Sequence, residues 1–144
     1  MVSMNVLLAV DGSEVSHRAV DRVISLAAEL KTPPTVQLLH VHLPVPIGFA
    51  TRHVSRETLD AYYREEGETE LAPARAQLDA AGISFTPHIH VGQPAETICH
   101  VASQFGCTLI AMGTHGRGAL ATMMIGSVAG KVLQLATVPV LLAK

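Results

Sequence analysis

The chain has 144 residues, a length typical of one domain, and 49% of its residues are hydrophobic. The net charge is −2 and the Lys and Arg residues are scattered, which argues against the concentrated basic surface of a nucleic-acid-binding protein. No apolar stretch approaches the roughly 20 residues of a membrane span, and the start of the chain lacks the basic segment and long apolar core of a signal peptide. Two cysteines without a CxxC spacing form no disulfide framework, so we expect a cytoplasmic protein.

The first half of the chain predicts two strands, each followed by a helix. Val6–Val10 is a continuous apolar run, which is typical of a strand buried on both faces. Ser13 is a good N-cap for the helix that follows, and Val36–Val41 is the second strand. A polar, Glu-rich helical region covers Ser55–Ala81, and Pro73 either kinks this helix or divides it in two.

The second half continues the same alternation. Phe85–Val91 alternates apolar and polar residues, and Pro87 places this strand at a sheet edge because it cannot donate a ladder hydrogen bond. Gln93–Glu96 opens a helix with proline at its first position, and the spacing predicts Phe105 on its inner face. The remaining predicted elements are a strand at Thr108–Met112, a helix at Ser127–Ala136 and a strand at Val138–Leu142.

Strict alternation of strands and helices predicts a parallel sheet with helices on both faces, joined by right-handed crossovers. In such sheets, ligands bind beyond the carboxyl ends of the strands, near the point where the strand order reverses. Asp11, Val41 and Gly113 each lie at the carboxyl end of a predicted strand, so we expect them to line one crevice.

A glycine-rich segment, Met112–Lys131, matches neither of two common nucleotide-binding templates. A Walker loop reads GxxxxGK[ST], whereas Gly126 and Gly130 are separated by three residues and Val132 follows the lysine. A Rossmann fingerprint reads GxGxxG after the first strand, where this chain has Asp-Gly-Ser-Glu. The segment therefore needs a different interpretation.

The spacing of the glycines favours another kind of phosphate site. Gly113 and Gly116 follow a strand, where a missing Cβ lets a phosphate approach the backbone. Gly126 and Ser127 begin the last helix, where unpaired N–H groups and the helix dipole attract an anion, and Arg117 adds positive charge. We expect the two ends of the segment to meet around the phosphates. On the alternative interpretation, the glycines only form turns.

This pattern, Gly113-x-x-Gly116, nine residues and then Gly126-Ser127, resembles the nucleotide-binding motif of the universal stress proteins. The resemblance extends over the whole chain. It includes VLLAVDGSE from Val6 to Glu14, LLHVH from Leu38 to His42, GQP from Gly92 to Pro94, MGTHGRG from Met112 to Gly118, and GSVAGKVL and PVLLAK near the end.

The resemblance implies one universal stress protein domain over residues 1–144. The implied fold is α/β and similar to that of the adenine nucleotide alpha hydrolases, a doubly wound five-stranded parallel sheet in the order 3-2-1-4-5. ATP, ADP or AMP would bind at the switch point, and Mg²⁺ is a candidate ion bound together with the nucleotide. The protein would be a cytoplasmic stress-response regulator that forms homodimers through Val138–Leu142 and has a protein partner that the sequence does not name.

Carried over position by position, the resemblance places Ala9 and Asp11 beside the base and ribose and implies that Val41 reads adenine through its backbone. The start of the last helix, with the Ser127 hydroxyl, would hold the phosphates, and the glycine-rich loop would wrap the ribose and phosphates. No residue is implied to be catalytic. The remaining implied contacts are Gly113, Thr114, His115, Gly116, Arg117, Gly118, Ala119, Gly126, Val128 and Ala129.

Asp11 and a group of histidines each have two interpretations. Asp11 is either a ligand of ribose or of a nucleotide-bound Mg²⁺, or an Asx residue that forms the turn before the helix. The histidines share strand faces in pairs, and the implied strand order makes their strands neighbours, so four imidazoles are expected to cluster. Such a cluster either binds zinc, senses pH or is polar surface. These residues are His40, His42, His88 and His90.

Three functions stay open on the sequence. The first is a regulator whose loop between Arg117 and Gly126 is ordered by ATP. The second is a slow ATP hydrolase, for which the chain offers no evident general base and no second carboxylate beside the phosphates. The third is an interaction module that binds no nucleotide.

Overall fold

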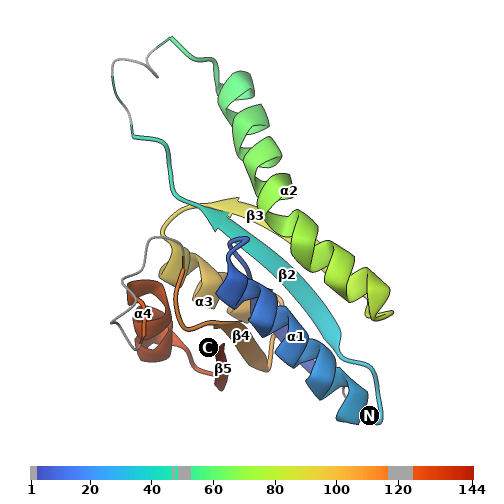
Figure 1. The fold of residues 1–144 in the computed structure, drawn as a ribbon. Helices are drawn as coiled ribbons and strands as arrows, with labels where there is room; N and C mark the ends of the chain where they lie inside the picture. Colours follow the sequence, from blue (N-terminus) through green and yellow to red (C-terminus); the bar gives the residue numbers. More distant parts are fainter. Residues whose placement is uncertain (1–2, 47, 49–52, 117–124) are drawn as a thin grey trace.

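Strands and helices alternate along the whole chain in the computed structural model, which describes residues 3–46, 48, 53–116 and 125–144 (Figure 1). No helix in these residues is both long and apolar enough to cross a membrane. The elements are β1 (Asn5–Ala9), α1 (Glu14–Glu29), β2 (Thr35–His42), α2 (Arg56–Ala80), β3 (Phe85–Val91), α3 (Pro94–Gln104), β4 (Leu109–Gly113), α4 (Ser127–Leu135) and β5 (Val140–Ala143).

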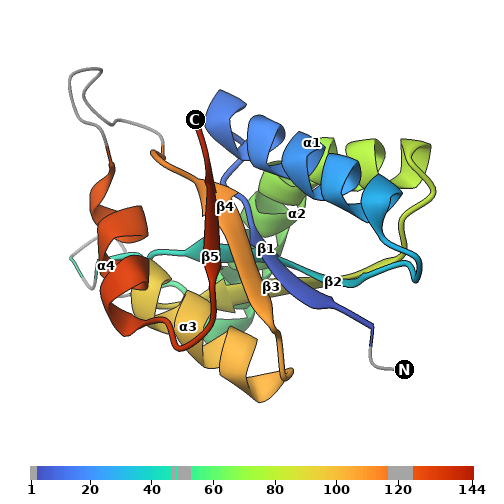
Figure 2. The same cartoon turned by 90° about the horizontal axis from the view of Figure 1, so that it is seen from below.

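The five strands form one parallel sheet in the order β3-β2-β1-β4-β5, which confirms the predicted fold. Helices α1 and α2 cover one face of this sheet, and α3 and α4 cover the other (Figure 2). The connections after β1 and β4 therefore leave the carboxyl edge of the sheet toward opposite faces. This divergence is the switch point at which doubly wound sheets bind ligands.

The central strand β1 contributes to the core on both of its faces. Val6 and Leu8 pack toward α1 and α2, whereas Leu7 packs toward α3 and α4, and all three side chains are 0% exposed. The continuous apolar run in the sequence is explained by this position, because a strand covered on both faces has no polar side.

The helix ends follow local sequence signals. Ser13 caps α1 as predicted, because its Oγ accepts a hydrogen bond from the Ser16 N–H at 3.2 Å. Helix α2 runs without interruption through Pro73, so of the two predicted alternatives, a kink or a division of the helix, the division is wrong. Leu71 and Leu78, on either side of the proline, are fully buried against the sheet, and this packing stabilises the helix despite one missing hydrogen bond.

Strand β3 lies at the sheet edge, as Pro87 predicted. The prediction that Phe105 faces inward is wrong. Phe105 is the C-cap of α3 and 38% exposed, and its ring lies 4.6 Å from the His88 ring on β3. Gly106 follows with a φ of 63° and ends the helix, so the chain turns away before Phe105 reaches the buried face.

Two helical glycines are expected to respond in opposite ways to alanine. A Cβ on Gly130 in α4 would have only Ile125 nearby, at 4.0 Å, so Gly130→Ala should raise the free energy of unfolding by about 0.5–1 kcal/mol through helix propensity. A Cβ on Gly67 in α2 would lie 2.6–2.9 Å from Ile89 side-chain atoms, so Gly67→Ala should lower it by about 1 kcal/mol. Urea denaturation of both variants measures the two changes, and equal signs would contradict this packing.

Candidate functional site

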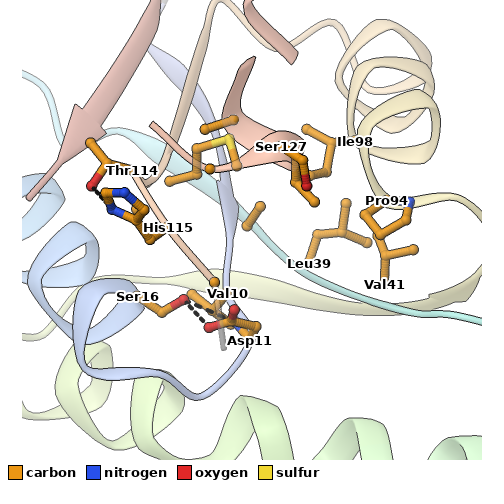
Figure 3. A pocket seen from close by; sticks show the side chains of 17 residues that line it. Val10, Asp11, Ser16, Leu39, Val41, Pro94, Ile98, Thr114, His115 and Ser127 are labelled. Atoms are coloured by element: carbon orange, nitrogen blue, oxygen red, sulfur yellow. Dashed lines mark hydrogen bonds between the residues drawn. The ribbon is translucent and has the colours of Figure 1, made fainter. Parts of the chain in front are cut away.

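A cavity of about 350 Å³ opens at the carboxyl edge of the sheet, where β1 and β4 diverge (Figure 3). The structure brings Asp11, Val41 and Gly113 together around it, as their strand-end positions predicted. Arg117, Gly118 and Ala119 lie outside the described residues. The other predicted positions that line the cavity are Ala9, Thr114, His115, Gly116, Gly126, Ser127, Val128 and Ala129.

One wall of the cavity is apolar, and most of its residues were not predicted from the sequence. Leu39 and Val41 come from one face of β2, and Met112 comes from the end of β4. The period of two along a strand could have identified Leu39, because it shares its face with Val41. The further lining residues that were not predicted are Val10, Ser16, Pro94 and Ile98.

Part of the apolar wall is open to the cavity because β2 extends further toward the carboxyl edge than β1 does. The Val10 N–H donates a hydrogen bond to the Leu39 carbonyl at 2.9 Å, and the pairing between β1 and β2 ends there. Strand β2 continues to His42, paired with β3. The backbone of Val41 therefore lies beside the cavity, beyond the end of the central strand.

The two ends of the glycine-rich segment meet, as expected. The Thr114 N–H donates to the Ala143 carbonyl at 2.8 Å, and the Gly126 N–H donates to the Thr114 carbonyl at 2.6 Å. The second bond fixes the start of α4 against the end of β4. Gly126 is the N-cap of α4 and has no side chain that could cap the helix. Gly126 and Ser127 line the cavity, so the positive end of this helix lies at the cavity.

Gly113, Gly116 and Gly126 each lie where an added Cβ would come close to the protein's own atoms. A Cβ on Gly113 would lie 2.5 Å from Val15 Cγ1, and a Cβ on Gly126 would lie 3.2 Å from the Thr114 carbonyl oxygen. A Cβ on Gly116 would lie 2.8 Å from an Asp11 carboxylate oxygen. A side chain at any of these positions would therefore disturb the protein's own packing, and the approach of a phosphate to these glycines stays a prediction.

For Asp11, the structure confirms the Asx turn, and the ligand role stays a prediction. Its Oδ1 accepts a hydrogen bond from the Ser13 N–H at 2.9 Å, which is the Asx turn expected before a helix. Asp11 also lines the cavity, on the same side as Gly116. A structural role in the turn thus does not remove the carboxylate from the site.

The prediction of a four-histidine cluster is wrong. His88 and His90 pair in register with Leu39 and Val41, so they lie on the opposite face of the sheet from His40 and His42. The ring centroids lie 6.2 Å apart in the His40–His42 pair and 6.4 Å apart in the His88–His90 pair. Among the described residues, no group of three or more His, Cys, Asp or Glu is placed to hold a metal ion.

Each histidine pair instead has local partners. The His40 Nδ1–H donates to the Val10 carbonyl at 2.9 Å, which supports the end of β1 from a buried position. His88 Nε2 and Gln37 Oε1 are hydrogen-bonded at 2.6 Å. At the site itself, His115 Nδ1 lies 2.9 Å from Thr114 Oγ1.

The fold and the cavity define a doubly wound α/β protein with a ligand-sized site at its switch point. The sequence model of the universal stress protein family matches residues 3–144, and the chain belongs to this family. It is 32% identical to the universal stress protein YxiE of Bacillus subtilis over 145 residues, which cover 96% of this chain and 97% of the relative.

Solved structures agree with this assignment. The protein MJ0577 of Methanocaldococcus jannaschii superimposes with a TM-score of 0.82 at 27% identity, over 100% of this chain and 97% of that one. A universal stress protein in complex with cAMP superimposes with a TM-score of 0.73 at 23% identity, over 100% of this chain and 99% of that one. The second likeness shows the fold alone.

The histidine on the edge strand should make stability depend on pH. Burial, and then the nearby His90, lower the pKa of His88 below its ordinary value of 6.5. The unfolded chain then binds more protons, so the stabilisation is present above that value and is lost as the pH falls through it. We expect His88→Gln to show a smaller loss of unfolding free energy between about pH 7 and pH 5 than the parent protein. His100→Gln, on the exposed side of α3, is the control and should keep the parental slope.

Proposed function

We propose that this protein binds an adenine nucleotide, ATP or its products ADP and AMP, in the cavity at the carboxyl edge, and acts as a cytoplasmic stress-response regulator. The observation that carries the proposal is the combination of an apolar wall and a bare helix N-terminus in one cavity. A flat apolar base and a charged phosphate chain need these two surroundings at once. Solved members of the family that carry cAMP, dAMP and AMP support the ligand class.

The two ends of the cavity suit the two ends of a nucleotide. We place the base against Leu39 and Met112, where the Val41 backbone is available for its polar edge. We place the phosphates at Ser127, where the first N–H groups of α4 attract negative charge. The ribose then lies between these ends, beside Asp11.

The described lining favours a regulator over a rapid hydrolase. Asp11 is the only carboxylate among the described residues that line the cavity. One carboxylate together with nucleotide phosphates suits a Mg²⁺ ion, which usually keeps several waters and takes one or two carboxylates. Rapid hydrolysis also needs a positioned general base, and His115 Nδ1 lies 2.9 Å from Thr114 Oγ1, within hydrogen-bond distance of a neutral hydroxyl.

Replacing the N-cap of α4 should weaken nucleotide binding. Valine at Gly126 would press on the Thr114 carbonyl and displace the start of α4, so Gly126→Val should weaken ATP binding at least about tenfold by isothermal titration calorimetry. Gly130→Ala is the matched control in the same helix, where a Cβ has open space, and it should bind ATP as the parent does.

The outcomes separate the alternatives. A parent protein that binds no ATP, ADP or AMP rejects the proposed function and favours a pure interaction module. Normal ATP binding by Gly126→Val would show that the phosphates do not lie at α4. Phosphate release from ATP and Mg²⁺ on the order of 1 per second would favour the hydrolase instead.

We further propose that two copies of the chain pair through β5. This strand pairs with β4 alone in the part of the chain that the structure describes, and Leu133 and Leu135 at the end of α4 are 46% and 43% exposed. An apolar edge of this kind promotes association, because its backbone groups remain available to another strand.

A charge in this edge should separate the copies. Val140→Lys is expected to sediment as a monomer, whereas the parent sediments as a dimer. The reason is that pairing of the two β5 strands would bury a lysine charge without an opposite charge beside it. Thr137→Lys, at an exposed position just before the strand, is the control and should remain dimeric. Circular dichroism checks that both variants are folded, and a monomeric parent would contradict the proposal.

A further inference from the structure

Ser16 in the first turn of α1 contacts Asp11 twice. Its Oγ–H donates a hydrogen bond to Asp11 Oδ1 at 2.7 Å, and the same oxygen accepts one from the Asp11 N–H at 3.0 Å (Figure 3). Ser16 is only 6% exposed and lines the cavity. One buried hydroxyl therefore fixes both the backbone and the carboxylate of the residue that follows the central strand.

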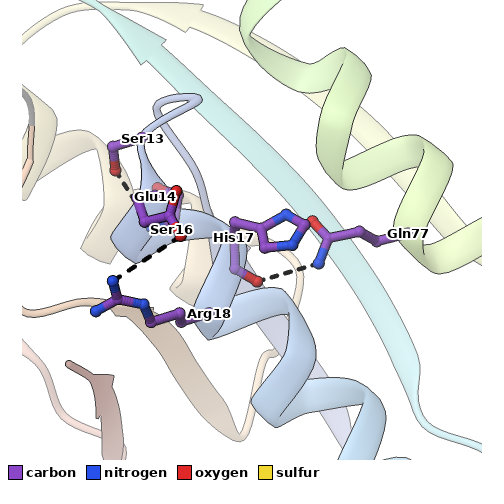
Figure 4. A network of polar contacts seen from close by, with 6 residues as sticks. All are labelled: Ser13, Glu14, Ser16, His17, Arg18 and Gln77. Carbon is purple, nitrogen blue, oxygen red and sulfur yellow. Dashed lines mark hydrogen bonds and ion pairs between the residues drawn. The ribbon is translucent and has the colours of Figure 1, made fainter.

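Ser13 completes a closed set of hydrogen bonds with these two residues. Its N–H donates to Asp11 Oδ1 at 2.9 Å. Its Oγ accepts a hydrogen bond from the Ser16 N–H at 3.2 Å (Figure 4). Helix α1, which follows this turn, is hydrogen-bonded to α2, because Gln77 Nε2 donates to the His17 carbonyl at 3.1 Å. Asp11 Oδ1 thus receives two donors from a rigid turn.

These hydrogen bonds hold the Asp11 carboxylate in one orientation in the structure. With Oδ1 held by Ser13 and Ser16, Asp11 Oδ2 lies on the side of Gly116, since a Cβ on that glycine would be 2.8 Å from it. Both Asp11 and Gly116 line the cavity. A carboxylate oxygen in a fixed position accepts a hydrogen bond from a hydroxyl donor, and hydrogen bonds to charged groups are the stronger class.

We infer that Ser16 is a positioning residue that orients the Asp11 carboxylate toward a ribose hydroxyl, so that the site selects ribonucleotides over deoxyribonucleotides. This inference rests on the proposed function, because it assumes that an adenine nucleotide occupies the cavity. Without the Ser16 hydroxyl, Asp11 Oδ1 loses one of its two donors in the turn and the Asp11 N–H loses its acceptor, so the orientation of the carboxylate is held less firmly.

The experiment compares three nucleotides rather than one. Affinities for ATP, 2′-deoxy-ATP and 3′-deoxy-ATP are measured by calorimetry with the parent, Ser16→Ala and Ser16→Thr. The parent is expected to bind ATP about tenfold more tightly than at least one deoxy analogue. Ser16→Ala should reduce that ratio to about one, mainly by weakening ATP, and Ser16→Thr, which keeps the hydroxyl, should restore it. Ser25→Ala, at an exposed position of the same helix, is the control and should keep the parental ratio.

A merely structural role of Ser16 would weaken all three nucleotides equally, and that result would overturn the inference. A parent that binds ATP but does not discriminate against either deoxy analogue would also overturn it, while leaving the proposed function intact. A parent that binds none of the three contradicts the proposed function itself. If Ser16→Ala does not fold, as judged by circular dichroism, Ser16→Cys keeps the side-chain size with a weaker donor and is expected to reduce the ratio.

Discussion

Close contact of main chain with main chain at the carboxyl edge of the sheet is the constraint on which the site depends. The hydrogen bond from the Gly126 N–H to the Thr114 carbonyl brings the start of α4 against the end of β4. Gly113 permits the end of β4 to lie against Val15, where any Cβ would overlap side-chain and backbone atoms. Without these contacts, the positive end of α4 would not face the cavity that β1 and β2 open.

The turn after β1 shows how one residue serves both fold and site. Asp11 holds the Asx turn through Ser13, and its carboxylate still lines the cavity. This double use is physically reasonable because a carboxylate has two oxygens and several lone pairs. Hydrogen bonds within the turn already order the Asp11 side chain. Ligand binding therefore costs less side-chain entropy, which is the general advantage of a preorganised site.

The cavity is assembled from elements that have no common local sequence. The apolar wall comes from β2, α3 and β4, whereas the polar end comes from the α1 turn and the start of α4. The parallel topology brings them together, because all five strands end at the same edge and the connections after β1 and β4 leave toward opposite faces. Membership of the universal stress protein family agrees with this arrangement.

The amino-acid sequence by itself determined the order and type of the elements, the parallel sheet and the strand-end residues that meet at one edge. These features depend on local periodicity, caps and the alternation of strands with helices, which are all present along the chain. The identity of Leu39 as a lining residue was within reach of the same periodicity, but Ser16 and Ile98 were not, because helices bring them to the cavity from outside the strand ends.

Only the tertiary structure decided which faces and spaces these residues occupy. The histidine pairs separate because the register between β2 and β3 sets Leu39, not His40, opposite His88, and a shift of one residue reverses the face. The continuity of α2 through Pro73 depends on burial of the residues around it, and the need for glycine at position 113 depends on Val15 from another element. Register and packing between distant segments are not encoded in local spacing, so they appear only when the whole chain is folded.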